Sequence, residues 1–580
     1  MVETGKAPDI DGSMQPQPRP DRFFAFLLGF CMFSTGASGL VNEYVLATIT
    51  TYILGNSIEQ FSLVIASMML MMGVSGLVQN RMSDDALVYR FIGIEVLVAL
   101  LGGFAPLAIY AAYGYLHHHF LFVHYFFVLM VGFLIGFEIP VVMRIIEQNR
   151  IRLKANLVIV YAMDYIGAFV GAVVWVTWLL KHYPLTEISF IVAGFNFIVA
   201  VFAVFYYIMR KDQKHNILVF SVIILTACAL LYGYIHNREL SDLMEQRFYD
   251  DPIVHRETTR YQHLVVTKNP GTGDVRLYIN GNTQFSSLDE NRYHDFLVHP
   301  VMALAKRKSN VLLLGGGDGL ALRELNKYAD VEHISLVDLD PDMVKLAATE
   351  PNLAMLNDNA FRDERVRFIA GEGVTPADIR PVLLAGDNSF NAGHPGTEHA
   401  DSEWVASIHV INVDADRFLD GVSGRKWDVV IVDFPDPSSV ELSKLYSKQF
   451  YRKLARHLSP DALVAIQSTS PYHAKEAFLA IGATLRAAEY KVIPYRQNIP
   501  SFGDWGFFLA WRSEVTEKTR VQAIKEVDHF DVETTFITPE LMVASLAFGK
   551  GELHSSAPCI NTLMHPCLVQ HYNEYSWIIE

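Results

Sequence analysis

Aspartate residues follow short apolar segments at several points in the second half of this sequence. They are Asp318, Asp338, Asp414, Asp433 and Asp436. The apolar segments are rich in Val, Ile and Leu, which is typical of buried strands in a parallel sheet. Because ligands of an open parallel sheet bind at the carboxyl ends of its strands, we expect these carboxylates to surround one cleft. Taken singly, each acid could instead cap a helix or a turn.

A cleft ringed by carboxylates suits one class of ligand better than others. Negative side chains disfavour phosphate-rich cofactors such as NADP and favour a cationic ligand. A sulfonium nucleoside therefore fits this pattern better than a dinucleotide.

A glycine-rich turn follows one of the predicted strands. The strand runs directly into 315–319 (Gly-Gly-Gly-Asp-Gly), and a helix at about 320–328 leads to a second strand that ends near Asp338. This order is a βαβ unit, and Gly315 and Gly317 let backbone N–H groups approach a ligand closely. An acid about 20 residues further on can accept hydrogen bonds from ribose hydroxyls. The unit predicts a nucleoside or nucleotide site, and the alternative is a tight structural turn.

Strands and helices alternate through the rest of the second half. A small antiparallel β unit is predicted at 255–288, where a β-branched strand precedes an Asn-Gly turn. A helix at about 289–306 then leads to the strand before the glycine-rich turn, and later strands are predicted at 408–413, 427–432 and 462–466. This alternation indicates an α/β Rossmann-like domain of the methyltransferase type.

The first half of the sequence is much more apolar than the second. Hydrophobic residues make up 51% of the chain, and the mean hydropathy is +0.22. A helix needs roughly 20 apolar residues to cross a bilayer core of about 30 Å. Seven stretches reach that length: about 23–51, 56–80, 87–112, 118–146, 155–180, 184–209 and 216–236. The first is too long for the apolar core of a cleaved signal peptide, so we predict a multi-pass α-helical membrane domain.

These patterns divide the 580 residues into four parts. We predict an N-terminal tail at 1–21, a transmembrane domain of about seven helices at 22–236, a small β unit with its linking helix at 237–300, and the Rossmann-like domain at 301–580.

Four acidic residues lie inside the predicted spans: Glu43, Glu95, Glu138 and Asp164. Charged side chains are costly in hydrocarbon and usually face the interior of a helix bundle. These acids could guide a cation, or they could form hydrogen bonds between helices or lie near the headgroups. Small residues at 36–39 and 167–171 predict close contact between helices.

Charge and cysteine content argue against two kinds of partner. The net charge of -15 disfavours nucleic acid, because phosphate binding needs a basic surface. The four cysteines have no spacing typical of zinc ligands, so no metal site is predicted. Two of them, Cys559 and Cys567, lie close together near the C-terminus.

The second half also resembles the spermidine synthase family, in pieces that occur in the family's order from about 258 to 512. The matching pieces are Tyr261-Gln262, Asn280-Gly281 with Gln284, Asp289-Glu290, Tyr293-His294-Asp295, the turn at 315–319, Asp338, Asp414-Ala415, 433–437 and 500–507. The stretch 433–437 with Lys444-Leu445-Tyr446 is similar to a branch of the family in which a multi-pass region precedes the synthase.

The resemblance implies a polyamine aminopropyltransferase. Such an enzyme moves the aminopropyl group of decarboxylated S-adenosylmethionine to putrescine or another amine, and putrescine yields spermidine and methylthioadenosine. The nucleoside is a co-substrate, so no tightly bound cofactor is implied. The lipid bilayer is a further partner, and a homo-oligomer is compatible with the family.

The resemblance also implies a role for each matching residue. Asp433 corresponds to the general base. The implied substrate contacts are Gln262, Tyr293, His294, Asp318 and Asp436. The implied nucleoside contacts are Gly315, Gly317, the ribose ligand Asp338 and the adenine-side acid Asp414.

Two segments depart from the family pattern. Many soluble relatives have a Thr-Tyr-Pro-like segment near the acceptor, whereas this chain has Ile499-Pro500-Ser501 and lacks that phenol hydroxyl, which leaves the acceptor open. The segment 371–407 is longer than the family needs and could be a lid or a disordered loop.

Two other functions stay open. A methyltransferase that uses intact S-adenosylmethionine would have the same βαβ core, although Tyr293-His294 and the paired acids Asp433 and Asp436 favour an amine acceptor. The other is a polyamine transporter or sensor whose synthase half only binds its ligand.

Basic residues alternate between the connections of the predicted spans. Twelve Lys and Arg residues lie in the tail and after the second, fourth and sixth spans, against Lys181 alone elsewhere in the bundle. The positive-inside rule places the N-terminus in the cytoplasm, and seven spans then put the second half outside, where Cys559 and Cys567 could pair. The donor is made in the cytoplasm, which argues for the other side, and one span fewer would reverse the result. We expect a cell-membrane protein, with a slight preference for an extracytoplasmic catalytic half.

Overall fold

The structure, a computed structural model, describes residues 22–54, 57–79, 81–148, 153–210, 217–369, 407–422 and 424–574. The chain divides into two compact units, one largely before Phe248 and the other largely from Phe248 onward. The expected tail at 1–21 and the expected insertion at 371–407 lie outside the described residues, apart from Ser407, which begins a strand.

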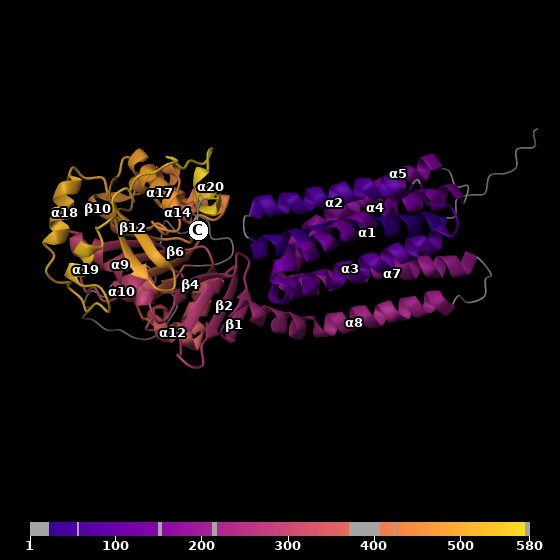
Figure 1. The fold of residues 1–580 in the computed structure, drawn as a ribbon, viewed down its shortest axis with the longest axis horizontal. Helices are drawn as coiled ribbons and strands as arrows, with labels where there is room; N and C mark the ends of the chain where they lie inside the picture. Colours follow the sequence, from indigo (N-terminus) through magenta and orange to yellow (C-terminus); the bar gives the residue numbers. More distant parts are fainter. Residues whose placement is uncertain are drawn as a thin grey trace, which may run out of the picture. The chain divides into compact units, whose positions relative to one another are not determined.

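The first unit is a bundle of long apolar helices (Figure 1). They are α1 (Arg22–Leu54), α2 (Ser57–Gln79), α3 (Leu87–Tyr115), α4 (Phe120–Gln148), α5 (Leu153–Val174), α7 (Leu185–Arg210) and α8 (Ile217–Glu245). A π-helical turn (Trp175–Leu179) and the short helix α6 (Leu180–His182) continue α5. Helix α3 packs against α4, α7 and α8. Helix α8 runs past the boundary expected at 236.

Six helical segments among the described residues are long and apolar enough to cross a membrane. They are Glu59–Gln79, Leu87–Tyr115, Phe120–Gln148, Leu157–His182, Leu185–Phe205 and Ile217–Phe248. They coincide with the second to seventh stretches expected from the sequence. The first stretch forms α1, a helix of 33 residues, but it is not among the six. Its polar residues include Asn42 and Glu43, which lower its hydropathy.

Helices α1 and α5 approach each other at the expected small residues. A Cβ atom added at Gly36 would lie 2.2 Å from the carbonyl oxygen of Asp164, and one added at Gly167 would lie 2.1 Å from that of Phe33. Any larger side chain would force the two backbones apart. The prediction of close helix contact at 36–39 and 167–171 is therefore confirmed.

The second unit begins with a small antiparallel sheet. Its strands lie in the order β1 (Ile253–Thr258), β2 (His263–Lys268), β3 (Val275–Ile279) and β4 (Asn282–Ser286). Asn280 and Gly281 connect β3 to β4, and both have positive φ, 50° and 80°. Positive φ at both positions is what a two-residue hairpin turn requires, so the Asn-Gly turn forms as predicted.

The main sheet has eight strands in the order β11-β12-β10-β9-β5-β6-β8-β7. They are β5 (Asn310–Gly315), β6 (His333–Asp338), β7 (Val366–Phe368), β8 (Ser407–Asn412), β9 (Trp427–Asp433), β10 (Leu458–Gln467), β11 (Lys491–Ile499) and β12 (Gly503–Trp511). The strands from β10 to β7 are parallel, whereas β12 pairs antiparallel with both β10 and β11. The hairpin of β11 and β12 was not predicted.

Helices cover both faces of this sheet (Figure 1). They are α9 (Glu290–Leu304), α10 (Leu320–Leu325), α11 (Pro341–Thr349), α12 (Pro351–Leu356), α14 (Ala415–Gly421), α15 (Val440–Lys444), α16 (Lys448–Ala455), α17 (Lys475–Ala487), α18 (Glu517–Lys525), α19 (Pro539–Ala544) and α20 (Cys567–Glu574). Successive residues of β5 point into opposite cores, Val311 and Leu313 into one and Leu312 and Leu314 into the other. A strand buried on both faces reads as a continuous apolar run, which is why the sequence revealed it.

Replacing Gly167 with alanine tests the close contact of α1 and α5. We expect Gly167→Ala to lower the free energy of unfolding of the bundle by about 1–3 kcal/mol, because the new methyl group meets the backbone of Phe33. The matched control is Gly194→Ala on α7, where nothing lies within 4 Å of the added Cβ, and alanine there should be neutral or stabilise by about 0.5–1 kcal/mol. Thermal unfolding of the full-length protein in lipid nanodiscs measures both, and equal effects of the two substitutions would contradict the contact.

Candidate active site

The glycine-rich turn lets two strand ends come together. Gly315 has a φ of 85° and lies opposite Asp433 in the register of β5 and β9. A Cβ atom at Gly315 would lie 2.1 Å from the carbonyl oxygen of Asp433. Glycine at this position therefore allows the end of β9, with its aspartate, to lie directly beside the turn.

Asp338 closes the other side of the turn. Its carboxylate accepts hydrogen bonds from the backbone N–H groups of Gly317 at 3.0 Å and Asp340 at 2.9 Å. A Cβ atom at Gly317 would lie 2.7 Å from that carboxylate, so only glycine permits this approach. Burial, together with the charges of Asp340 and Asp318, raises the pKa of Asp338 to about 6.

Gln262 reaches the same region from the small sheet. Its side chain forms a hydrogen bond with Asp340, which also accepts from the hydroxyl of Thr259 at 2.6 Å. Asp340 in turn caps the first turn of α11. The structure thus places Gln262 beside Asp338 through Asp340, and the sequence analysis missed both Thr259 and Asp340.

Asp433 accepts a hydrogen bond from the hydroxyl of Tyr293 at 2.5 Å. Its carboxyl group is half-buried at the end of β9. Burial and the nearby charge of Asp318 raise the pKa of Asp433 to about 6, while the charge of His294 and the Tyr293 hydrogen bond act in the opposite direction. Asp433 is therefore largely ionised at pH 7 and can still accept a proton.

His294 supplies the positive charge next to these acids. Its Nδ1 lies 2.8 Å from Oε2 of Glu290, one helical turn earlier on α9. Burial disfavours the charged ring, but the hydrogen bond to Glu290 and the charges of Glu290, Asp318 and Asp433 raise the pKa of His294 to about 9. A protonated imidazole thus lies within electrostatic reach of Asp318 and Asp433.

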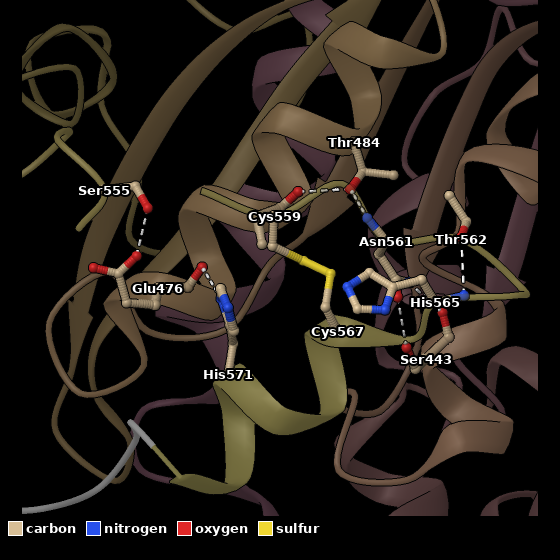
Figure 2. Close-up of a disulfide and its surroundings, with 11 residues drawn as sticks. Ser443, Glu476, Thr484, Ser555, Cys559, Asn561, Thr562, His565, Cys567 and His571 are labelled. Atoms are coloured by element: carbon tan, nitrogen blue, oxygen red, sulfur yellow. Dashed lines mark hydrogen bonds between the residues drawn. A yellow bond between two sulfur atoms is a disulfide. The ribbon is translucent and has the colours of Figure 1, made fainter. Parts of the chain in front are cut away.

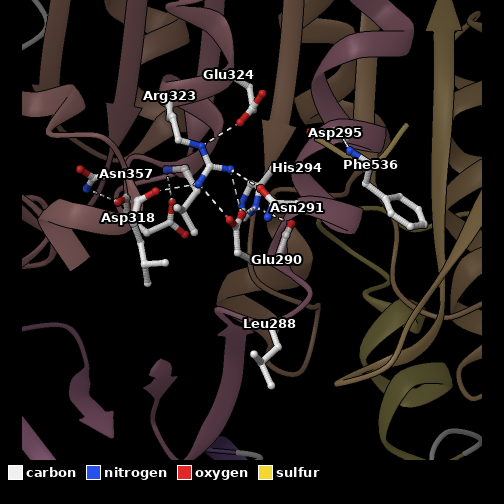
Figure 3. Close-up of polar contacts among 12 residues, drawn as sticks. Leu288, Glu290, Asn291, His294, Asp295, Asp318, Arg323, Glu324, Asn357 and Phe536 are labelled. Atoms are coloured by element: carbon white, nitrogen blue, oxygen red, sulfur yellow. Dashed lines mark hydrogen bonds and ion pairs between the residues drawn. The ribbon is translucent and has the colours of Figure 1, made fainter. Parts of the chain in front are cut away.

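Arg323 holds Glu290 in place from α10 (Figure 3). Its guanidinium donates two hydrogen bonds to the Glu290 carboxylate, at 2.9 and 3.0 Å, and a third to Glu324 at 2.8 Å. All these groups are buried. Glu290 was matched to the family by sequence without a role, and its spacing of four residues from His294 on a helix is the signal that could have suggested one.

Asp318 lies between the glycine turn and this network. One carboxylate oxygen accepts from the backbone N–H of Leu320 at 2.9 Å, and its carbonyl accepts from Asn357 at 2.9 Å. Its charge acts on His294, Asp338 and Asp433. Asp318 therefore lies within electrostatic reach of both Asp338 and Asp433.

Asp436 completes the acid cluster from the loop after β9. Gln467 and Thr469 donate to its two oxygens at 3.1 and 3.0 Å, and Tyr572 forms a further hydrogen bond. Burial raises the pKa of Asp436 despite these hydrogen bonds. The charges of both Asp433 and Asp436 act on the phenol of Tyr293, so the two carboxylates lie near the same hydroxyl.

Asp414 stands apart from the other four aspartates. Its side chain caps α14 by accepting from the backbone N–H of Arg417 at 3.0 Å, and it forms an ion pair with Lys444 at 2.9 Å. Although burial opposes the effect, the hydrogen bond and charge of Lys444 hold the pKa of Asp414 below its usual value. Of the five aspartates, Asp318 acts on Asp338 and Asp433, Asp436 acts on Tyr293 beside Asp433, and Asp414 is paired with Lys444.

A disulfide between Cys559 and Cys567 closes a short loop within the C-terminal segment (Figure 2). Asn561, between the two cysteines, accepts from Ser443 at 3.1 Å and donates to its carbonyl at 2.8 Å. Helix α20 then carries Tyr572 to Asp436. The sequence analysis raised the possibility of this disulfide but did not predict the contact of its loop with Ser443.

The turn between β11 and β12 is anchored to the start of α9. The backbone N–H and hydroxyl of Ser501 donate to Asp289 at 2.7 and 2.9 Å. Next along the chain, the rings of Phe502 and Trp505 lie 5.1 Å apart. The residues that replace the family's phenol are therefore held rigidly.

Three buried side chains in this unit could hold a metal ion by their spacing: Asp295, His299 and Glu324. In the structure they are hydrogen-bonded. His299 contacts Glu324 at 3.0 Å and Tyr328 at 2.8 Å, and Asp295 accepts from the backbone of 536–537. They therefore extend the buried polar network of Arg323.

Comparison with known proteins places these features in a family. The profile of the Spermine/spermidine synthase domain matches residues 290–378 and 404–522. Polyamine aminopropyltransferase 1 of Ralstonia nicotianae is 36% identical over 86% of this chain and 86% of its own length. The Polyamine aminopropyltransferase of Oceanobacillus iheyensis is 32% identical over 93% of this chain and 95% of its own length. Among solved structures, spermidine synthase from Thermotoga maritima has 20% identity and a TM-score of 0.39 over 52% of this chain and 87% of that one.

Proposed function

We propose that this chain, which belongs to the polyamine aminopropyltransferase family, transfers the aminopropyl group of decarboxylated S-adenosylmethionine to putrescine. The products are spermidine and methylthioadenosine. One observation carries the proposal: Asp433, held by Tyr293, lies among Asp318, Asp436 and a protonated His294 at the end of the glycine-rich turn.

The acceptor amine must lose a proton before it can react. A primary amine has a pKa near 10 by analogy with lysine and is protonated at neutral pH. Asp433 takes this proton, and the hydroxyl of Tyr293 on Oδ1 orients the carboxylate so that Oδ2 faces the amine. The nitrogen then forms a bond to the aminopropyl carbon while the carbon–sulfur bond breaks. The electron pair of the broken bond stays on sulfur and neutralises the sulfonium. The leaving group needs no further activation, so the remaining task is alignment.

The same acids select the substrates by charge. Asp318 and Asp436 hold cationic amines on either side of Asp433. Decarboxylated S-adenosylmethionine brings only positive charge, whereas intact S-adenosylmethionine also brings a carboxylate that these acids would repel. This repulsion favours aminopropyl transfer over methyl transfer.

The nucleoside lies against the glycine turn in this proposal. Asp338 accepts from the ribose hydroxyls, and Gly315 and Gly317 let the backbone approach the donor. Gln262 borders this region through Asp340. Asp414 faces the adenine from the adjoining strand end, and its ion pair with Lys444 keeps it ionised.

Replacement of the base tests the proposal directly. We expect Asp433→Asn to lower kcat for aminopropyl transfer by about 10²-fold or more, because an amide cannot accept the amine proton. The matched control is Asp428→Asn at the other end of β9, where the acid accepts from the backbone N–H of Asn310, and its kcat should stay near that of the wild type. The assay follows methylthioadenosine from decarboxylated S-adenosylmethionine and putrescine, and near-normal turnover of Asp433→Asn would remove Asp433 from this role.

The pH dependence of kcat tests the electrostatic chain from Glu290 to Asp433. Asp433 must be ionised to act, so kcat at saturating donor should fall as pH drops through about 6. Glu290→Gln removes the partner that keeps His294 charged, and loss of that positive charge raises the pKa of Asp433. The acid limb should therefore move to higher pH in Glu290→Gln. Glu350→Gln replaces a buried acid that caps α12 and serves as the control. An unshifted acid limb in Glu290→Gln would show that Glu290 does not act on Asp433 through His294.

We also propose that the catalytic unit lies on the extracytoplasmic side of the cell membrane. The alternation of basic residues supports an N-terminus in the cytoplasm. The disulfide of Cys559 and Cys567 is typical of an oxidising compartment. The proposal requires seven crossings, so α1 must span the membrane in addition to the six candidate spans.

Reporter fusions decide the side. Alkaline phosphatase fused after Glu580 should be active in cells, because that enzyme matures only outside the cytoplasm. A fluorescent reporter that folds only in the cytoplasm, fused at the same place, should stay dark. Fluorescence without phosphatase activity would put the catalytic unit in the cytoplasm and imply an even number of crossings.

A further inference from the structure

Three helices of the bundle bring carboxylates together in its interior. Glu95 lies on α3, Glu138 on α4 and Asp164 on α5 (Figure 1). Glu95 is 0% exposed and Glu138 is 3% exposed, while Asp164 is half-buried. Glu138 is the middle member, because it lies within electrostatic reach of both Glu95 and Asp164. We call these three residues the acid row.

No basic side chain neutralises the acid row among the residues that the structure describes. Both carboxylate oxygens of Glu95 are buried without a hydrogen-bond partner. Glu138 accepts a hydrogen bond from the hydroxyl of Thr35. Ion pairs within the described part of the bundle include Arg144 with Asp84, His236 with Glu239 and Arg238 with Glu187. None of them includes a member of the row.

Uncharged polar groups line the neighbouring face of α1. Thr35, Ser38 and Asn42 are spaced three and four residues apart, so they share one face of the helix, and all are buried. Ser38 donates to the amide oxygen of Asn196 on α7, while the amide nitrogens of Asn42 and Asn196 have no hydrogen-bond partner. The interior of the bundle is therefore polar on several helices at once.

A carboxylate buried without any partner is costly in an apolar environment. Two neighbouring carboxylates add mutual repulsion, which only a cation or a proton can remove. The acid row does not converge on one point. Among the described residues, the three-residue group whose ligand atoms all lie within 4.8 Å of one another is in the other unit. A ligand with positive charges separated along a chain fits a row better than a single metal ion does.

We propose that the helix bundle contains a binding site for a linear diamine or polyamine at Glu95, Glu138 and Asp164. The site is separate from the acid cluster around Asp433, and the choice of ligand class rests on the proposed aminopropyl transfer. Successive ammonium groups of the ligand pair with successive carboxylates, and the amides of Asn42 and Asn196 border the site.

Equilibrium binding of radiolabelled putrescine and spermidine to the full-length protein in lipid nanodiscs tests this site. The starting protein carries Asp318→Asn and Asp436→Asn, which weaken amine binding in the catalytic unit. We expect it to retain one amine site, and adding Glu95→Gln with Glu138→Gln should weaken that site at least about tenfold, because charged hydrogen bonds are lost. The matched control adds Glu187→Gln, a buried bundle acid that already pairs with Arg238, and should leave the binding unchanged.

Catalysis provides the check on folding. Glu95→Gln with Glu138→Gln, placed in the otherwise wild-type chain, should leave aminopropyl transfer unchanged. Amine binding that is insensitive to the bundle substitutions would overturn the proposal. So would the absence of amine binding in the Asp318→Asn, Asp436→Asn protein, because the row would then hold protons alone. A wild-type chain that binds amines at the row but transfers no aminopropyl group would support the site and reject the proposed function.

Discussion

Repulsion among carboxylates at the carboxyl edge of one parallel sheet is the constraint on which the catalytic unit depends. Burial and the charge of Asp318 raise the pKa values of Asp338 and Asp433. The unit offsets this with a buried positive charge on His294. Arg323 holds Glu290, and Glu290 holds the proton on His294. The charge of His294 therefore lowers the pKa of Asp433 and favours its ionised form despite burial and the nearby Asp318.

Other parts of the fold also stabilise the carboxyl edge of the sheet. Gly315 lets β9 end beside the glycine turn, and Asp289 ties the β11–β12 turn to α9. The disulfide closes a loop in the C-terminal segment, and Tyr572 of that segment forms a hydrogen bond with Asp436. Apart from the disulfide, these contacts join residues more than a hundred positions apart in the chain, so the site depends on the folded sheet as a whole.

The buried acids of the bundle and those of the catalytic unit differ in the positive charges near them. Around Asp433, a histidine and an arginine supply positive charge within the protein. In the acid row of Glu95, Glu138 and Asp164, no described side chain does so, and Glu95 lacks even a hydrogen bond. In the first arrangement, charged side chains of the protein itself compensate the buried acids. The second is incomplete without a ligand or a proton, which is the physical basis for proposing a cation site there.

The sequence alone determined the features that depend on local pattern. Continuous apolar runs revealed the buried strands, the length of the apolar stretches revealed the long helices, and Asn280-Gly281 revealed the hairpin. The glycines at 315–317 followed from the βαβ order, and the residues around Asp433 from family resemblance. These signals are readable because periodicity, turn conformation and glycine geometry act over a few neighbouring residues.

Only the tertiary structure decided which polar groups meet. It tied Asp414 to Lys444, brought Arg323 to Glu290, and carried Tyr572 on the last helix to Asp436. It also inserted β12 antiparallel between β10 and β11. Pairings of this kind depend on strand order and on how helices pack across the sheet. A carboxylate in the sequence looks the same whether it caps a helix, pairs with lysine or faces a substrate.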